Sequence, residues 1–356
     1  MAERDDTVDV TGPGDGIDSG DAPVRDEEEP LDPQRVIIDP HHHLWDHSGL
    51  PQVVPGTRPF LVQDMLATIR SSGHNVTHTV YVECHSMYRQ DGPIDMRPVG
   101  ETEFANGMAA MAASGRYGNT RVAHGIVGNA DLRLGTRVRP VLEAHLAAGN
   151  GRLRGVRMAS AYVPGTMFGF PTDAAAEGVL RDPALQAGAR LLPSLGLTLD
   201  LWCFHTQLAQ FASLASACPE TLIVLDHLGT PALFNAPAHE HREIIASWRS
   251  GIIELARRPN VRIKLGGLAS NFNQPLGGPP AATSSIQLAR DWKVFIETCI
   301  EAFGAARCMF ESNYPTDTLC TYGAMWNAFK RITAGCSEAE KERLFSGTAR
   351  EVYRLN

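Results

Sequence analysis

The chain has 356 residues, of which 43% are hydrophobic and 20% are charged. This length and apolar content suit one large α/β barrel or two average domains, and they exclude a collagen, a coiled coil or a wholly disordered chain. No apolar run reaches the roughly 18 residues that a membrane-spanning helix needs. The acidic N-terminus lacks the apolar stretch of a secretory signal, so we expect no membrane partner.

The negative charge is concentrated at the N-terminus. Residues 1–32 hold twelve acidic residues against two arginines, a charge of −10, so the remaining residues sum to +2. Residues 1–34 also lack apolar side chains that would offset the entropy cost of ordering, which predicts a disordered acidic tail before a folded domain over 35–356. The nearly neutral body has no basic run, so nucleic acid is not an expected partner.

Seven cysteines are present, and none forms a C-x-x-C pair. Several lie in apolar runs, as in Leu201-Trp202-Cys203-Phe204. This pattern favours buried, reduced thiols and a cytoplasmic location.

From residue 36 onward, short apolar or β-branched runs alternate with longer segments of helical pattern. Eight runs predict strands over 36–39, 79–84, 122–128, 155–159, 197–204, 221–226, 261–265 and 308–310. Nine helices are expected over 61–72, 101–116, 136–149, 175–194, 206–217, 240–258, 285–304, 321–334 and 337–353. Continuous apolar strands that alternate with helices indicate parallel βαβ units, and eight units predict a closed (β/α)8 barrel.

A doubly wound open sheet is the main alternative to this barrel. Such a sheet usually has a glycine-rich phosphate turn after its first strand. Here the first strand runs into Pro40-His41-His42-His43 instead. The loops over 86–100 and 271–284 follow the second and seventh strands and would lie on the face where barrel active sites are built.

Histidines stand at the carboxyl ends of three predicted strands. Alternation along the first strand places His41 and His43 on one face and His42 on the other. His205 closes the fifth strand and His227 closes the sixth. Each could be a core histidine alone, but together they predict one pocket that binds a cation or an anionic substrate oxygen.

Several motifs along the chain resemble the amidohydrolase superfamily, and in particular its amidohydrolase-related branch of lactone hydrolases. They are Ile38-Asp39-Pro40-His41-His42-His43-Leu44-Trp45-Asp46, Val80-Tyr81-Val82-Glu83, Arg154-Gly155-Val156-Arg157, Val224-Leu225-Asp226-His227-Leu228-Gly229 and Glu311-Ser312-Asn313-Tyr314-Pro315. The resemblance implies a (β/α)8 barrel with a hydrolytic site at its carboxyl end.

By this resemblance His41, His43 and His205 are ligands of a divalent metal such as zinc or, in a metal-free site, contacts to the substrate. The eighth-strand position, ordinarily a metal-binding aspartate that also serves as base, is Asn313. An amide cannot accept the proton and brings no charge to a metal. Asn313 at this position therefore leaves open whether the site binds a metal and which group acts as the base.

Three other carboxylates could take the proton of the attacking water. Glu83 and Asp317 are equal candidates, and Glu311 follows them, because it could also be a buried carboxylate paired with Arg157 or Lys264. Arg157 could bind a substrate carboxylate with its planar fork or tie the barrel rim to a loop. The remaining candidate substrate contacts are His85, Tyr88 and Asn313, and Asp226 could orient a neighbouring group.

These residues predict a hydrolase that acts on a small cyclic ester, or lactone, bearing a carboxylate or hydroxyls. One alternative is a carbon–carbon lyase of the same superfamily, such as a decarboxylase. The other is a catalytically reduced barrel that only binds a small molecule. The sequence leaves open whether the chain forms a homo-oligomer.

Overall fold

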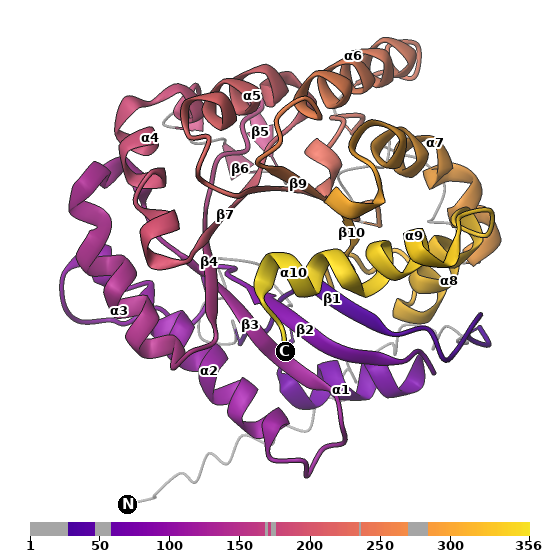
Figure 1. Cartoon of the computed structure of the whole chain (residues 1–356), viewed down its shortest axis with the longest axis horizontal. Coiled ribbons are helices and arrows are strands. Elements are labelled where there is room, and N and C mark those ends of the chain that lie inside the picture. The colour runs from indigo at the N-terminus through magenta and orange to yellow at the C-terminus, as the bar shows by residue number, and fades with distance from the viewer. Residues whose placement is uncertain (1–27, 47–57, 168–169, 172–175, 235, 270–283) are drawn as a thin grey trace, which may run out of the picture.

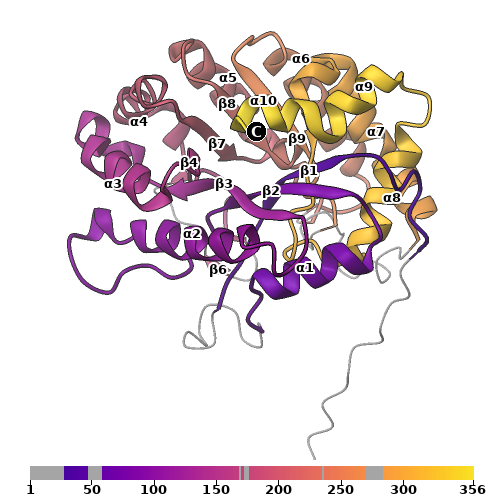
Figure 2. The same cartoon turned by 60° about the horizontal axis from the view of Figure 1, so that its bottom comes forward.

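The protein was analysed as a computed structural model that describes residues 28–46, 58–167, 170–171, 176–234, 236–269 and 284–356. Eight parallel strands form one sheet in the order β1-β2-β3-β4-β7-β8-β9-β10. The ring closes where His42 pairs with Tyr314, just beyond β10. Helices surround the strands (Figures 1 and 2), which confirms the predicted (β/α)8 barrel.

All eight predicted strands are present. Their bounds are β1 (Ile37–His42), β2 (Val76–Val82), β3 (Arg121–Asn129), β4 (Leu153–Met158), β7 (Thr198–Trp202), β8 (Ile223–Asp226), β9 (Val261–Leu265) and β10 (Cys308–Phe310). A short antiparallel pair, β5 (Thr166–Met167) and β6 (Phe170–Pro171), lies between β4 and β7 in the chain.

The helices also follow the prediction, with two differences. Their bounds are α1 (Val62–Ser71), α2 (Val99–Ala113), α3 (Arg139–Gly149), α4 (Pro183–Ala189), α5 (Leu208–Ala217), α6 (His241–Leu255), α7 (Ser285–Phe303), α8 (Tyr322–Ile332), α9 (Glu338–Glu342) and α10 (Thr348–Tyr353). The helix expected over 175–194 is shorter, because Pro183 starts α4 and Pro193 lies in a separate 3-10 turn over Leu192–Leu195. The helix expected over 337–353 contains a π-turn at Arg343–Gly347.

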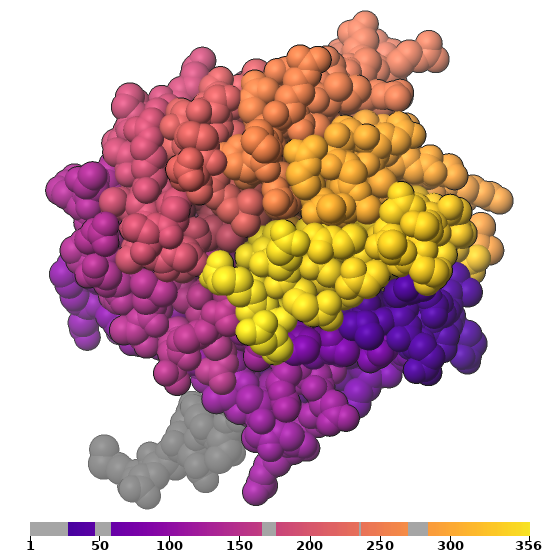
Figure 3. Space-filling view, viewed as in Figure 1, coloured from indigo at the N-terminus to yellow at the C-terminus, as the bar shows by residue number. Residues whose placement is uncertain are grey.

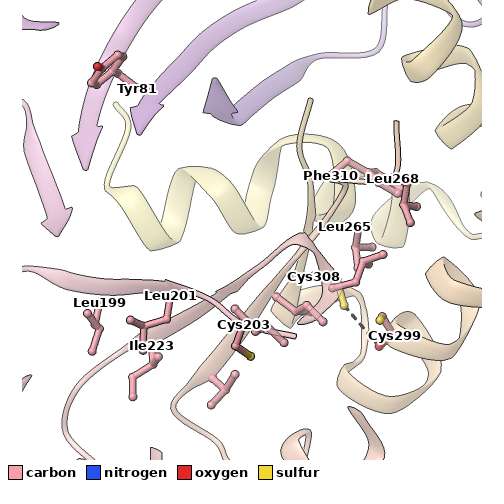
Figure 4. Close-up of a cluster of buried hydrophobic side chains, with 14 of the residues drawn as sticks. Tyr81, Leu199, Leu201, Cys203, Ile223, Leu265, Leu268, Cys299, Cys308 and Phe310 are labelled. Atoms are coloured by element: carbon pink, nitrogen blue, oxygen red, sulfur yellow. Dashed lines mark hydrogen bonds between the residues drawn. The ribbon is translucent and has the colours of Figure 1, made fainter. Parts of the chain in front are cut away.

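Two apolar layers hold the barrel together. The larger one lies between the strands and the outer helices, and Figure 4 shows Leu199, Leu201 and Ile223 of adjacent strands within it. The smaller one fills the barrel interior. Burial of apolar area on both sides of each strand explains why these strands read as continuous hydrophobic runs.

The C-terminal helix α10 lies across the ring of strands (Figure 1). Val352, Tyr353 and Leu355 join the interior cluster together with Val80 and Val224. The C-terminal end of the chain therefore packs inside the barrel, below the carboxyl ends of the strands.

Part of the predicted tail contacts the barrel. Glu28 accepts hydrogen bonds from the backbone and side chain of Ser285 at the start of α7, and Leu31 N donates to Asn327 at 2.7 Å. In Figure 3 the first described residues (indigo) lie against the C-terminal residues (yellow). Residues 28–34 are thus ordered on the barrel, because their backbone groups find partners there, whereas the rest of the predicted tail, 1–27, is outside the described residues.

Among the described residues, no helix is both long and apolar enough to cross a membrane.

Candidate active site

The predicted site residues gather at the carboxyl ends of the barrel strands. His41 belongs to the end of β1 and Arg157 to the end of β4. His227 directly follows β8, and Glu311 directly follows β10. Parallel strands in a barrel bring these ends to one mouth.

Three of the four predicted histidines lie in contact. The ring centre of His41 is 5.0 Å from that of His43 and 4.7 Å from that of His227. His42 faces the other way, as predicted, and its Nε2 lies 2.8 Å from Thr79 Oγ1. His205 makes its contacts elsewhere: its Nδ1 accepts from Ala232 N at 3.2 Å, in the loop after β8.

Glu311 joins two of these histidines. Its Oε1 is 2.8 Å from His227 Nδ1, and its Oε2 is 2.9 Å from His41 Nδ1. Burial would raise the pKa of Glu311, but the two imidazoles outweigh it and hold the pKa far below its usual value. Burial would likewise lower the pKa of His227, but Glu311 holds it above the usual value. Burial and the Lys264 ammonium hold the pKa of His41 well below its usual value. Glu311 is therefore a buried ion-pair partner of His227 that also contacts His41, rather than a partner of Arg157 or Lys264.

Arg157 and Glu83 form a second buried pair. Arg157 Nε donates to Glu83 Oε1 at 2.7 Å, and its Nη1 lies 3.4 Å from His41 Nε2. Burial would raise the pKa of Glu83, but Arg157 lowers it below its usual value. Arg157 thus ties the end of β4 to Glu83, just after β2, and to His41 of β1. Its contact with a substrate carboxylate stays a prediction.

Asn313 connects His43 to Asp317. Asn313 Nδ2 donates to Asp317 Oδ1 at 2.8 Å, and Asn313 Oδ1 is 3.1 Å from His43 Nε2. The other oxygen of Asp317 accepts from Ala269 N at 2.9 Å. Burial raises the pKa of Asp317 to about 7. Neutral donors hold this carboxylate, so it binds a proton far more readily than Glu83 or Glu311.

His85 and Tyr88 lie at the edge of the site. His85 Nδ1 is 2.9 Å from Tyr88 Oη and 3.7 Å from Glu83 Oε2. The His85 side chain is 60% exposed. A cavity of about 260 Å³ opens beside it, lined by His85, Asn129, Asp131, Arg133, Met158, Ala159, Ala161 and Ala176.

Lys264 lies under the histidines and was not predicted as a site residue. Its Nζ is 2.8 Å from Asp200 Oδ2, 2.9 Å from Asp226 Oδ1 and 3.1 Å from His41 Nδ1. Burial would lower the pKa of Lys264, but the two aspartates raise it to about 12. Lys264 is therefore a fixed positive charge inside the barrel.

One group among the described residues has the donor types and spacing for a metal. It comprises His41, Asp226 and His227, whose ligand atoms lie within 4.8 Å of one another. It shares only His41 with the predicted set of His41, His43 and His205. Zinc prefers such imidazole and carboxylate ligands.

The surroundings of this group do not fit a metal. Lys264 contacts both Asp226 Oδ1 and His41 Nδ1, while Arg157 Nη1 is 3.5 Å from Asp226 Oδ2. Glu311 occupies His227 Nδ1. Two cations thus already contact the donor atoms of the group, and a dication there would meet strong like-charge repulsion.

The backbone at the mouth is held in an unusual conformation. His85, His227 and Asn313 have φ values of 60°, 55° and 52°. Non-glycine residues rarely adopt this left-handed region, and such strain is concentrated at functional sites.

Two glycines after β9 make room for the ion pair. A Cβ on Gly266 would lie 2.4 Å from Glu311 Cγ, and one on Gly267 would lie 2.5 Å from His227 Cβ. The adjacent glycines in Leu265-Gly266-Gly267 were the available signal for this close approach.

Asp200, Lys264 and Tyr353 are the functional candidates that sequence reasoning missed. Asp200 and Lys264 are inward-facing positions in apolar strands, where a buried charge is rare unless it is paired. Nothing local marks Tyr353, because its partner Asp200 lies 153 positions away.

Curated relatives match along the chain. An uncharacterized protein, y4mH, from Sinorhizobium fredii is 32% identical, covering 90% of this chain and 99% of the relative. An L-fucono-1,5-lactonase from Burkholderia multivorans is 28% identical, covering 65% of this chain and 71% of the relative.

Solved structures share the fold. A zinc-bound amidohydrolase from Burkholderia multivorans has a TM-score of 0.68 at 24% identity, covering 90% of this chain and all of that one. A probable 2-pyrone-4,6-dicarboxylic acid hydrolase from Acinetobacter baumannii, with citric acid bound, has a TM-score of 0.60 at 16% identity, covering 89% of this chain and 99% of that one. The 5-carboxyvanillate decarboxylase from Sphingomonas paucimobilis has a TM-score of 0.55 at 14% identity, covering 90% of this chain and 100% of that one.

The amidohydrolase family profile matches residues 38–355, which include all of the barrel strands except the first residue of β1, Ile37, and every residue of the mouth described above. The chain belongs to the amidohydrolase family.

Proposed function

We propose that this chain hydrolyses a small lactone that bears hydroxyls or a carboxylate. The observation that carries the proposal is the arrangement of Asp317 behind Asn313. Asn313 cannot take a proton, but it donates a hydrogen bond to a carboxylate that can. The lactonase relative from Burkholderia multivorans supports the same reaction class.

The cations of the mouth suit the carbonyl of an ester. His227 is ion-paired with Glu311 and about one-tenth exposed, and Arg157 stands across His41 from it. Donors of this kind stabilise the negative charge that develops on the carbonyl oxygen as water attacks.

In this mechanism Asp317 accepts the proton of the attacking water. The carbonyl carbon gains the hydroxyl, the ring C–O bond breaks, and the proton returns to the leaving alkoxide. The product is the open hydroxy acid. Glu83 and Glu311 serve as partners of Arg157 and His227, because these cations hold the pKa of each carboxylate low.

The cavity beside His85 suits the polar part of such a substrate. Asn129, Asp131 and Arg133 line it, and they offer amide, carboxylate and guanidinium groups. Hydroxyls and carboxylates are recognised by such groups.

A lactone panel tests the proposal. Wild-type protein is assayed with sugar 1,5-lactones and with carboxylated lactones, and proton release is recorded together with carbon dioxide. We expect proton release without carbon dioxide. His227→Gln should lower turnover by at least about 100-fold, the effect of losing an oxyanion donor.

His239→Gln is the matched control, because the His239 side chain is 79% exposed and it should keep full turnover. Carbon dioxide release from a carboxylated substrate would replace the proposal with a lyase. Saturable binding without any turnover across the panel would replace it with a binding protein.

A further inference from the structure

Lys264 is a fully buried charge at the centre of the barrel. It belongs to β9, its side chain is fully buried, and its ammonium contacts β7, β8 and β1 through Asp200, Asp226 and His41. A buried ammonium is costly unless anionic partners surround it. The barrel supplies two of them.

We propose that the Lys264 ammonium is the resident cation of this site and fills the place between His41 Nδ1 and Asp226 Oδ1 that a divalent metal would otherwise take. A catalytic role for the Lys264 ammonium rests on the proposed function, whereas the competition between this ammonium and a metal does not.

The competition follows from shared atoms. His41 and Asp226 belong to the one described group with metal-ligand spacing, and His41 Nδ1 lies 3.6 Å from Asp226 Oδ1. Each of these atoms is about 3 Å from Lys264 Nζ. Zinc bonded to both at about 2.1 Å would lie beside the ammonium. Two like charges at such separation in a buried site repel strongly.

The ammonium is held in place from below. Asp200 Oδ2 accepts from Lys264 Nζ at 2.8 Å and from Tyr353 Oη at 2.5 Å. The Tyr353 ring centre lies 5.5 Å from Nζ, within the range of a cation–π contact. Thr198 Oγ1 donates to the other oxygen of Asp200 at 3.0 Å. If Lys264 swung away, Asp200 would lose the cation that it contacts, and Asp226 would keep only the longer contact with Arg157.

A second cation, Arg157, lies near the other ring nitrogen of His41 and the other oxygen of Asp226. Arg157 Nη1 is 3.4 Å from His41 Nε2 and 3.5 Å from Asp226 Oδ2. His41 thus has a cation near each ring nitrogen, and Glu311 Oε2 lies 2.9 Å from the Nδ1 atom that faces Lys264. Lys264 is a positioning residue in this arrangement, because it acts on His41 and Asp226 rather than on a substrate.

The test is a zinc titration by calorimetry, with the bound metal measured by mass spectrometry after gel filtration. Lys264→Met is the main variant, since methionine is one heavy atom shorter and vacates the position of Nζ. Lys293→Met is the matched control, because Lys293 is an exposed lysine of α7 paired with Glu297.

We expect zinc to bind Lys264→Met at least about 100-fold more tightly than wild type, because the repulsion is gone and two aspartates remain. Adding Asp226→Asn to Lys264→Met should abolish that gain. Lys293→Met should bind zinc as wild type does.

The proposal is overturned if wild type retains zinc that Asp226→Asn loses, or if Lys264→Met gains no affinity. The comparison of wild type with Asp226→Asn decides the matter even if Lys264→Met does not fold. None of these readouts depends on turnover, so an error in the proposed function would leave the result unaffected.

Discussion

Asn313 Nδ2 donates to Asp317 Oδ1 at 2.8 Å, and this bond ties the carboxylate to the histidine pair of β1. On its other side Asn313 Oδ1 faces His43 Nε2 at 3.1 Å, while His43 Nδ1 faces Val82 O at 2.8 Å. Burial lowers the pKa of His43 to about 3, so the ring is neutral and carries one N–H. It cannot donate to both oxygens.

A protonated Asp317 would remove this conflict. It could donate to the oxygen of an Asn313 amide turned by half a turn, whose N–H would then donate to His43 Nε2.

The first prediction concerns the N-terminal segment. A chain that begins at Glu28 should keep the wild-type melting temperature, whereas one that begins at Arg35 should lose about 5 °C or more, because several hydrogen bonds of roughly 1 kcal/mol each disappear. These include the bonds from Lys330 Nζ to the carbonyls of Leu31 and Asp32. Calorimetry of the two chains measures the difference, and equal melting temperatures would show that the contacts of 28–34 contribute nothing.

The second prediction concerns Glu311. Glu311→Gln should lower the free energy of unfolding at pH 7 by about 3–5 kcal/mol, because it breaks a buried ion pair and leaves His227 and His41 without their carboxylate. The folded-state pKa of Glu311 is lowered, so its contribution is present above the unfolded pKa and is lost as the pH falls through the folded pKa. Urea titrations should therefore show that the difference in unfolding free energy between wild type and Glu311→Gln becomes smaller in strong acid. Glu297→Gln, at an exposed pair on α7, is the control and should leave stability unchanged.

The third prediction concerns Gly267. Its φ is +69°, and a Cβ there would collide with His227. Gly267→Ala should lower turnover by about 100-fold, the cost of displacing a reacting group by about 1 Å. Gly335→Ala should have no effect, because nothing lies within 4 Å of the added Cβ. Equal activities of the two variants would show that His227 does not need its present position.

The sequence was sufficient to predict the barrel and part of its mouth. Apolar runs such as Val261–Leu265 marked the strands, and strand ends placed His41, His43 and His227 correctly. These features are local, so periodicity and spacing reveal them.

The remaining roles depend on distances that no local pattern encodes. Glu83, Glu311 and Asp317 look alike in the sequence, and only their partners separate them: cations beside the first two and neutral donors beside the third. Tyr353 reaches Lys264 through Asp200 only because α10 packs inside the barrel. The acidic composition of residues 1–34 likewise gave no sign that Glu28 contacts α7.

The pH dependence of kcat/KM on a hydrolysed lactone, in wild type and in Asp317→Asn, tests the account most directly. Burial raises the pKa of Asp317 to about 7, so wild-type activity should rise as the pH increases through 7 and the carboxylate becomes able to accept a proton. Asp317→Asn should lose at least about 100-fold in kcat and lose this rise, as expected for a positioned base. Asp291→Asn, at an exposed position on α7, is the control. Wild-type turnover in Asp317→Asn, with the loss appearing in Glu83→Gln instead, would contradict the account and identify Glu83 as the base.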